Sequence, residues 1–100
     1  MEQNRLVIEW RPTNVGPQLY MPIEAVRRRG VEPDWLMRHV DEGLFPHAVS
    51  VAGVWRFSSA SLLRARRMRQ LERDFDAIPE LAALVADLLE EMDDLQARMR

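Results

Sequence analysis

Side chains able to perform catalysis or hold a metal are scarce in this sequence. His39 and His47 are its two histidines, and neither has a carboxylate or a second histidine at a spacing typical of a metal site. The chain contains no cysteine, no glycine-rich phosphate loop and no serine motif of the nucleophile-elbow type. The adjacent acids Glu90–Glu91 and Asp93–Asp94 fall on the outside of a predicted helix. We therefore predict a non-catalytic protein without cofactor or metal, in which both histidines are structural or surface residues.

The C-terminal segment has the pattern of a binding helix. Its apolar residues are spaced 4, 3, 4, 3 and 4 positions apart, which is typical of a coiled-coil seam: Leu81, Val85, Leu88, Met92, Leu95 and Met99. Leu84 and Leu89 widen the first half of this seam. An isolated helix of this length is only marginally stable in water. We therefore expect the seam, and above all its wide start at Leu84, Val85, Leu88 and Leu89, to pack on the preceding helix or on a second copy of the chain.

Charge is distributed unevenly along the C-terminal half. Residues 59–75 contain five arginines against Glu72 and Asp74, a net charge of +3. Residues 76–100 contain two arginines against seven acids, a net charge of −5. We expect arginines of the first segment to form ion pairs with acids of the second. The remaining acids and the end of the seam are the predicted partner-binding residues, namely Asp87, Glu90, Glu91, Asp94, Leu95 and Met99.

These features must be positioned by a single small domain, because 100 residues leave no room for a second core. Proline and glycine mark its elements. We predict a strand over 5–10 followed by a loop, a helix from Pro22 to Gly30, a second helix from Pro33 to Gly43, and a hairpin within 44–57. A third helix begins at Ser58 or Ser59, and a fourth runs from Pro79 to the C-terminus.

The resulting fold class is mostly α, a winged helix-turn-helix with a short β-hairpin wing followed by an amphipathic helix with coiled-coil spacing. We place an N-terminal strand and loop at 1–18, the winged helix-turn-helix at 19–75 and the C-terminal helix at 76–100. Trp35 and Trp55 are expected in the core, with Trp10 closing the strand onto it. One face of the third helix should also be core, with Leu62, Ala65, Met68, Leu71 and Phe75. The absence of cysteine and of a signal-like N-terminus favours the cytoplasm.

The predicted second helix, which would read DNA in such a fold, is poorly equipped for that task. Between residues 32 and 44 one arginine faces four acids, a net charge of −3, and His47 is the one possible cation from Pro46 to Val54. DNA binding would depend on phosphate contacts elsewhere, from Arg27, Arg28, Arg38, Arg56 and Arg64. It stays open as an alternative function.

Several short stretches resemble a known family. Tyr20-Met-Pro-Ile-Glu-Ala-Val, Gly30-Val31, Leu36, Glu42-Gly43-Leu44-Phe45 and Trp55-Arg56-Phe57-Ser58 are similar to the winged helix-turn-helix of the MerR family. That resemblance implies DNA contacts from the first two helices and wing, and dimerisation through a following helix in an antiparallel coiled coil.

From Tyr20 to the C-terminus the chain is also similar to a MerR-like subgroup, the CbpM-type chaperone modulators. The resemblance is carried by Gly43-Leu44-Phe45, Trp55-Arg56-Phe57, residues 67–75 and residues 84–95. It implies binding to the J domain of a DnaJ-like co-chaperone of the CbpA type and inhibition of its co-chaperone and DNA-binding activity. J domains present a basic helix to their Hsp70, which an acidic helix could cover.

Overall fold

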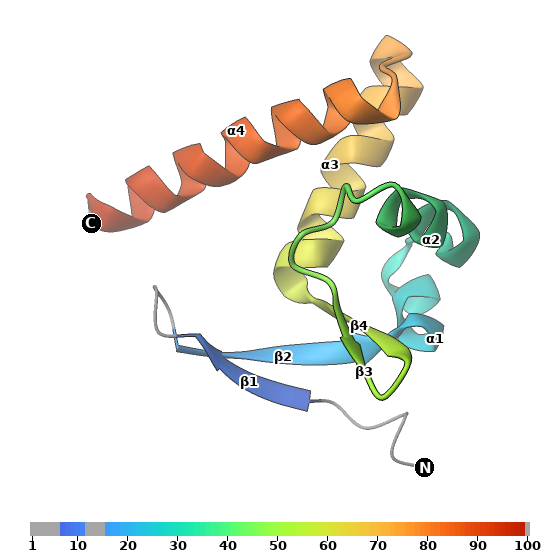
Figure 1. Cartoon of the computed structure of the whole chain (residues 1–100). Helices are drawn as coiled ribbons and strands as arrows, with labels where there is room; N and C mark the ends of the chain where they lie inside the picture. Colours follow the sequence, from blue (N-terminus) through green and yellow to red (C-terminus); the bar gives the residue numbers. More distant parts are fainter. Residues whose placement is uncertain (1–6, 12–15, 100) are drawn as a thin grey trace. The chain divides into compact units, whose positions relative to one another are not determined.

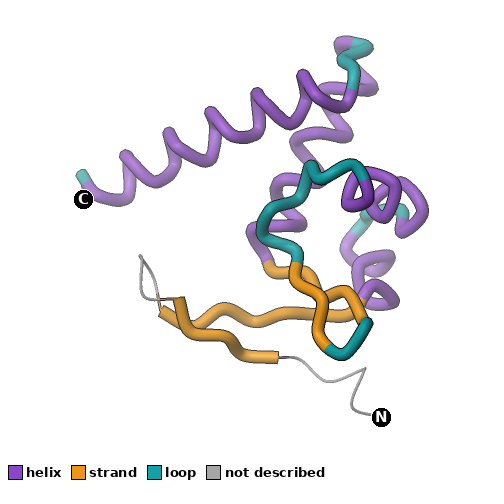
Figure 2. Tube along the Cα trace, viewed as in Figure 1, coloured by secondary structure: helices purple, strands orange, loops and turns teal. Residues whose placement is uncertain are grey.

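The computed structural model describes the backbone of residues 7–11 and 16–99, and the side chains of residues 20–99. The chain forms two compact units, residues 1–65 and 66–100, and the boundary between them falls inside a helix. The predicted boundaries at 18/19 and 75/76 stay predictions. Figures 1 and 2 show the elements, which in chain order are β1 (Val7–Arg11), β2 (Gly16–Pro22), α1 (Ile23–Val26), the 3-10 turn η2 (Arg27–Arg29), α2 (Pro33–Asp41), β3 (Val49–Val51), β4 (Val54–Ser58), α3 (Ser59–Phe75) and α4 (Pro79–Arg98).

The four strands form one antiparallel sheet in the order β1-β2-β4-β3. β1 confirms most of the predicted first strand, while Arg5 and Leu6 lie outside the described residues. β2 was missed, because Gly16 and Pro17 were interpreted as part of a loop. Both residues are poor strand formers in isolation. Pairing with β1 on one side and with β4 on the other supplies the hydrogen bonds that override this local preference.

The second helix begins and ends where proline and glycine predicted. The first lies within its predicted bounds, but Pro22 is the last residue of β2 and only Ile23–Val26 is α-helical. α1 passes into η2, and Gly30 closes that turn with a left-handed φ of 84° and its N–H donating to the Arg27 carbonyl at 3.1 Å. α2 has Pro33 in its first turn, and the Glu32 carboxylate accepts a hydrogen bond from the Asp34 N–H at 3.4 Å. Gly43, with φ of 77°, follows the end of α2.

Aromatic packing around α2 forms part of the core of the first unit. The Trp35 ring is buried, stacks on the His39 ring with centroids 4.0 Å apart, and meets the Phe45 ring edge-on at 6.2 Å. His39 Nδ1 donates to the Trp35 carbonyl at 2.8 Å, which confirms a structural role for this histidine. Trp55 is only half-buried, so its predicted place in the core was wrong, and the Trp10 side chain lies outside the described residues.

The wing confirms the predicted hairpin and turns on two residues with positive φ, Ala52 at 52° and Gly53 at 78°. This conformation defines a type I′ turn, which strongly prefers Asn-Gly and strains an L-residue such as alanine. We expect Ala52→Asn to raise the free energy of unfolding by about 0.5–1 kcal/mol in urea denaturation. The same change at Ala48, whose φ is negative, should give no gain. An equal gain at both sites would refute the turn-strain explanation.

In the second helix pair, α3 confirms its predicted start and α4 confirms its start at Pro79. Leu62, Ala65 and Met68 are buried as expected, and Leu71 is half-buried. Phe75 is 74% exposed, so its assignment to the core was wrong. It is the last residue of α3, where Asp76 adopts a φ of 55° and ends the helix. The apolar spacing of α3 therefore continues as far as Phe75, although the buried part of the helix ends before it.

Candidate protein-docking surface on helix α4

Helix α4 buries three of its four alanines, while Ala97 is exposed. Ala82 and Ala86 are fully buried and Ala83 is 6% exposed. The expected packing of Leu84, Val85, Leu88 and Leu89 within the chain was therefore wrong, because Leu84 and Leu88 are each 55% exposed and Val85 and Leu89 only half-buried. Their expected packing on a second copy of the chain stays a prediction. Alanine is neutral in a hydropathy pattern and easily overlooked. It suits a closely packed helix face, however, because its short side chain brings the helix backbone near its neighbours.

The large apolar residues of α4 face solvent instead. Five of them are 49–55% exposed and the last is 84% exposed; we call this set the apolar row: Leu81, Leu84, Leu88, Met92, Leu95 and Met99. Five of the six belong to the predicted seam, and Leu84 takes the place of Val85. At 100° per residue these six side chains fall within about 80° of one another around the helix. Phe75 and Ile78, which is 63% exposed, precede the row at the junction between α3 and α4.

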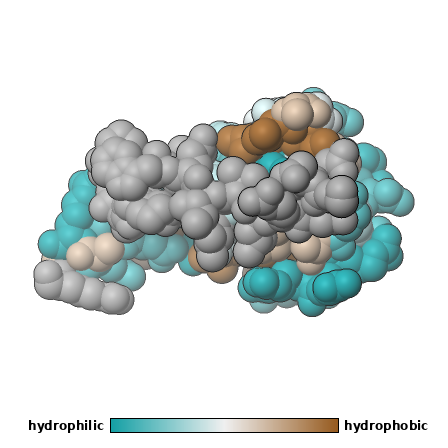
Figure 3. All heavy atoms as spheres, turned by 90° about the horizontal axis from the view of Figure 1, so that it is seen from below, coloured by the Kyte–Doolittle hydropathy of each residue, from teal (hydrophilic) through white to brown (hydrophobic). Residues whose placement is uncertain are grey.

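A row of this kind is unusual on a protein surface. The face drawn in Figure 3 is mostly hydrophilic outside the grey atoms, and its hydrophobic residues gather in a few patches. Soluble monomers rarely expose large contiguous apolar patches, and those that do commonly use them to bind. The apolar row therefore has the character of an interaction surface.

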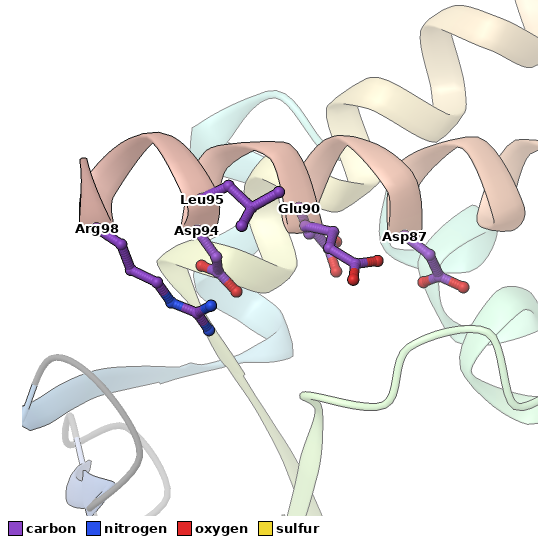
Figure 4. Close-up of a pocket in the computed structure, with 6 residues that line it drawn as sticks. Asp87, Glu90, Asp94, Leu95 and Arg98 are labelled. Atoms are coloured by element: carbon purple, nitrogen blue, oxygen red, sulfur yellow. The ribbon is translucent and has the colours of Figure 1, made fainter.

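The predicted acids lie beside the apolar row. We call Asp87, Glu90, Glu91 and Asp94 the acidic row; all are exposed except Glu90, which is half-buried. Together with Leu95 and Arg98 they line an open hollow along α4 (Figure 4). This hollow brings together five of the six predicted partner-binding residues, and Met99 is not among those that line it. Arg98 was missed as a site residue, although it follows Glu91 by seven positions and Asp94 by four and so shares their face.

Asp93 lies on another side of α4 than the acidic row. Its Oδ2 lies 2.9 Å from Nη2 of Arg67 in α3, and the two side chains are 49% and 23% exposed. This ion pair confirms, for one pair of residues, the expectation that arginines of the third helix meet acids of the fourth. Asp93 therefore belongs to the face of α4 that carries the buried alanines, and not to the acidic row.

The residues proposed for DNA phosphates divide into two groups. Arg27, Arg28 and Arg38 are exposed, whereas Arg56 is 4% and Arg64 is 2% exposed. Nε of Arg64 donates to the Leu44 carbonyl at 2.8 Å, and its guanidinium lies 5.8 Å from the centre of the Phe45 ring. Arg64 therefore holds the segment between α2 and the wing against α3. The exposed charges of α2 and its two flanking residues are Glu32, Asp34, Arg38, Asp41 and Glu42, so the solvent face of the reading helix is acidic.

This role of Arg64 can be tested by substitution with an uncharged side chain of similar length. We expect Arg64→Met to lower the free energy of unfolding by about 1.5–3 kcal/mol, because it leaves the Leu44 carbonyl without its charged donor. Arg69→Met, at an exposed position of α3, should change it by less than about 0.5 kcal/mol. Urea denaturation of both variants measures the difference. Equal stability of the two variants would contradict a structural role.

Comparison with known proteins assigns the family. The model of the MerR HTH family regulatory proteins matches residues 22–100. This chain belongs to the MerR family. Its winged helix-turn-helix and the C-terminal helix both lie within the match, whereas β1 and most of β2 precede it. No curated protein and no solved structure matches the chain. Among the described residues, none of the helices of this MerR-family protein combines the length and apolar character needed to cross a membrane.

Proposed function

We propose that this MerR-family protein is a chaperone modulator of the CbpM type. It binds the J domain of a DnaJ-like co-chaperone of the CbpA type and inhibits its co-chaperone and DNA-binding activity. The observation that carries the proposal is the acidic row of α4, placed beside an exposed apolar row on the same helix. The basic helix that J domains present complements the charge of the acidic row.

The acidic solvent face of α2 favours this function over DNA binding. An acidic recognition helix is repelled by DNA phosphates. Of the five arginines proposed for phosphate contacts, Arg56 and Arg64 are buried, so the other three are the exposed ones. Fold alone does not fix function, and a helix-turn-helix can serve as a scaffold for protein binding.

A calorimetric titration with the purified cognate J domain tests the proposal directly. We expect saturable binding that weakens as salt is raised, because charge complementarity contributes to it. The same J domain should then stimulate its Hsp70 ATPase less when the modulator is present. Absence of binding heat together with an unchanged ATPase rate would disprove the proposal.

The alternative function is a dimeric transcription regulator that binds DNA, which the family match supports. Its phosphate contacts would come from Arg27, Arg28 and Arg38, so its affinity for duplex DNA should fall steeply with salt. A mobility-shift assay at low salt with genomic fragments separates the two functions. Specific retardation would favour the regulator, and its absence would eliminate this alternative.

We further propose that the apolar row makes the protein a homodimer. Its six side chains repeat at intervals of three and four residues, the spacing that lets one helix pack along another. The acidic row flanks this contact, and we place the co-chaperone there.

A further inference from the structure

The Arg67–Asp93 ion pair occupies a distinctive place on α4. Asp93 follows Ala86 by seven positions, which is about two helical turns, and so points to nearly the same side. Residues 91–98 of α4 are all exposed, so Asp93 is an ion-pair contact beyond the last buried residue of the helix, Ala86. Contacts on this side of α4 therefore extend from Ala82 to Asp93, which is more than half of the helix.

That rotation is not the one that apolar burial alone would select. Three alanines are buried, while six large apolar side chains at about 160° around the helix remain about half-exposed or more. Rolling α4 about its axis would exchange the alanine face for the apolar row and remove more apolar surface from water. Some other interaction must therefore oppose the roll.

The ion pair supplies that opposition. The Arg67 side chain is largely buried, and its Nη1 atom is fully buried without a hydrogen-bond partner among the described residues. Rolling α4 would carry Asp93 away and leave the guanidinium without its carboxylate. The carboxylate of Asp93 is half-exposed, so the net contribution of the pair to stability is small, but its loss would leave a guanidinium with a buried edge and no carboxylate beside it.

We propose that Arg67 and Asp93 form a rotational lock that holds α4 with its apolar and acidic rows facing outward. Both residues are positioning residues, since neither belongs to the two rows. The inference rests on the proposed function only in treating those rows as docking surfaces. The lock itself can be tested without any partner protein.

The absence of cysteine from the sequence allows a two-site thiol assay. L88C reports on the apolar row and A86C on the buried face, each labelled with a maleimide at a protein concentration low enough to keep the chain monomeric. In the Asp93→Asn background we expect the reactivity of L88C to fall by about threefold or more and that of A86C to rise by about tenfold. Unfolding or loosening of α4 would raise the reactivity of both thiols. A fall in the reactivity of L88C therefore distinguishes rotation of the helix from loss of structure.

Two matched variants complete the experiment. Asp94→Asn removes the same charge from the neighbouring position and should change neither rate. The double exchange Arg67→Asp with Asp93→Arg should restore both rates toward those of the parent. An unchanged or increased L88C rate in Asp93→Asn, or the same two shifts in Asp94→Asn, would overturn the lock. J-domain binding plays no part in this readout, so a failure of the proposed function would leave it intact.

Discussion

Reversing the charge of Glu90 and Glu91 to arginine is expected to weaken J-domain binding by about 10- to 100-fold, or about 1.4–2.8 kcal/mol. Both side chains line the hollow along α4, beside the apolar row. A basic partner helix would meet repulsion there in place of attraction. Glutamate and arginine have similar helix propensities, so α4 should keep its structure, as circular dichroism can check. Isothermal titration calorimetry of parent and variant gives the change in affinity.

The chain offers a closely matched control for this experiment. Asp41 and Glu42 are also adjacent exposed acids, at the end of α2, and their reversal changes the net charge by the same amount. We expect J-domain affinity to stay within about twofold of the parent in Asp41→Arg/Glu42→Arg, apart from a small long-range effect that salt removes. Unchanged affinity after reversal of Glu90 and Glu91, or an equal loss in both double variants, would contradict a specific acidic site on α4.

The helix-turn-helix could be predicted from sequence because its boundaries depend on local backbone chemistry. Gly30 and Gly43 adopt positive φ, and Pro33 and Pro79 occupy first helical turns, as the residue types alone indicate. β2 could not be predicted in this way. Its first residues are poor strand formers. The strand forms because it pairs with β1, which is close in the sequence, and with β4, which is far from it in the sequence.

The candidate site was predicted in part for a related reason. Periodicity located the apolar row and the acidic row on α4, because both depend only on helix geometry. It did not show which face of the helix is buried, since the buried residues are alanines. Burial also separated arginines that look equivalent in sequence: Arg64 donates to a backbone carbonyl, Arg67 pairs with Asp93, and Arg27 is exposed. A count of charges contains no information of that kind.

The dimer proposal leads to a second large expected effect. Leu88→Ser/Leu95→Ser should raise the dimer dissociation constant by about 100-fold or more, because both leucines lie in the middle and later part of the apolar row and each copy loses two contacts. Their removal should leave the free energy of unfolding of the monomer almost unchanged, since both side chains are at least half exposed within a single chain. Sedimentation equilibrium over a range of concentrations measures the association.

Leu63→Ser provides the comparison, since Leu63 is 42% exposed on α3 and lies outside the apolar row. This substitution removes similar apolar surface, so the Leu63→Ser variant should dimerise like the parent if the apolar row is the interface. A parent chain that stays monomeric up to about 100 µM would refute the homodimer, because a dimer with that dissociation constant has only about 5.5 kcal/mol of association free energy. Dimerisation that persists in Leu88→Ser/Leu95→Ser would place the interface elsewhere. The apolar row would then be left, together with the acidic row, as the surface on which a basic amphipathic helix docks.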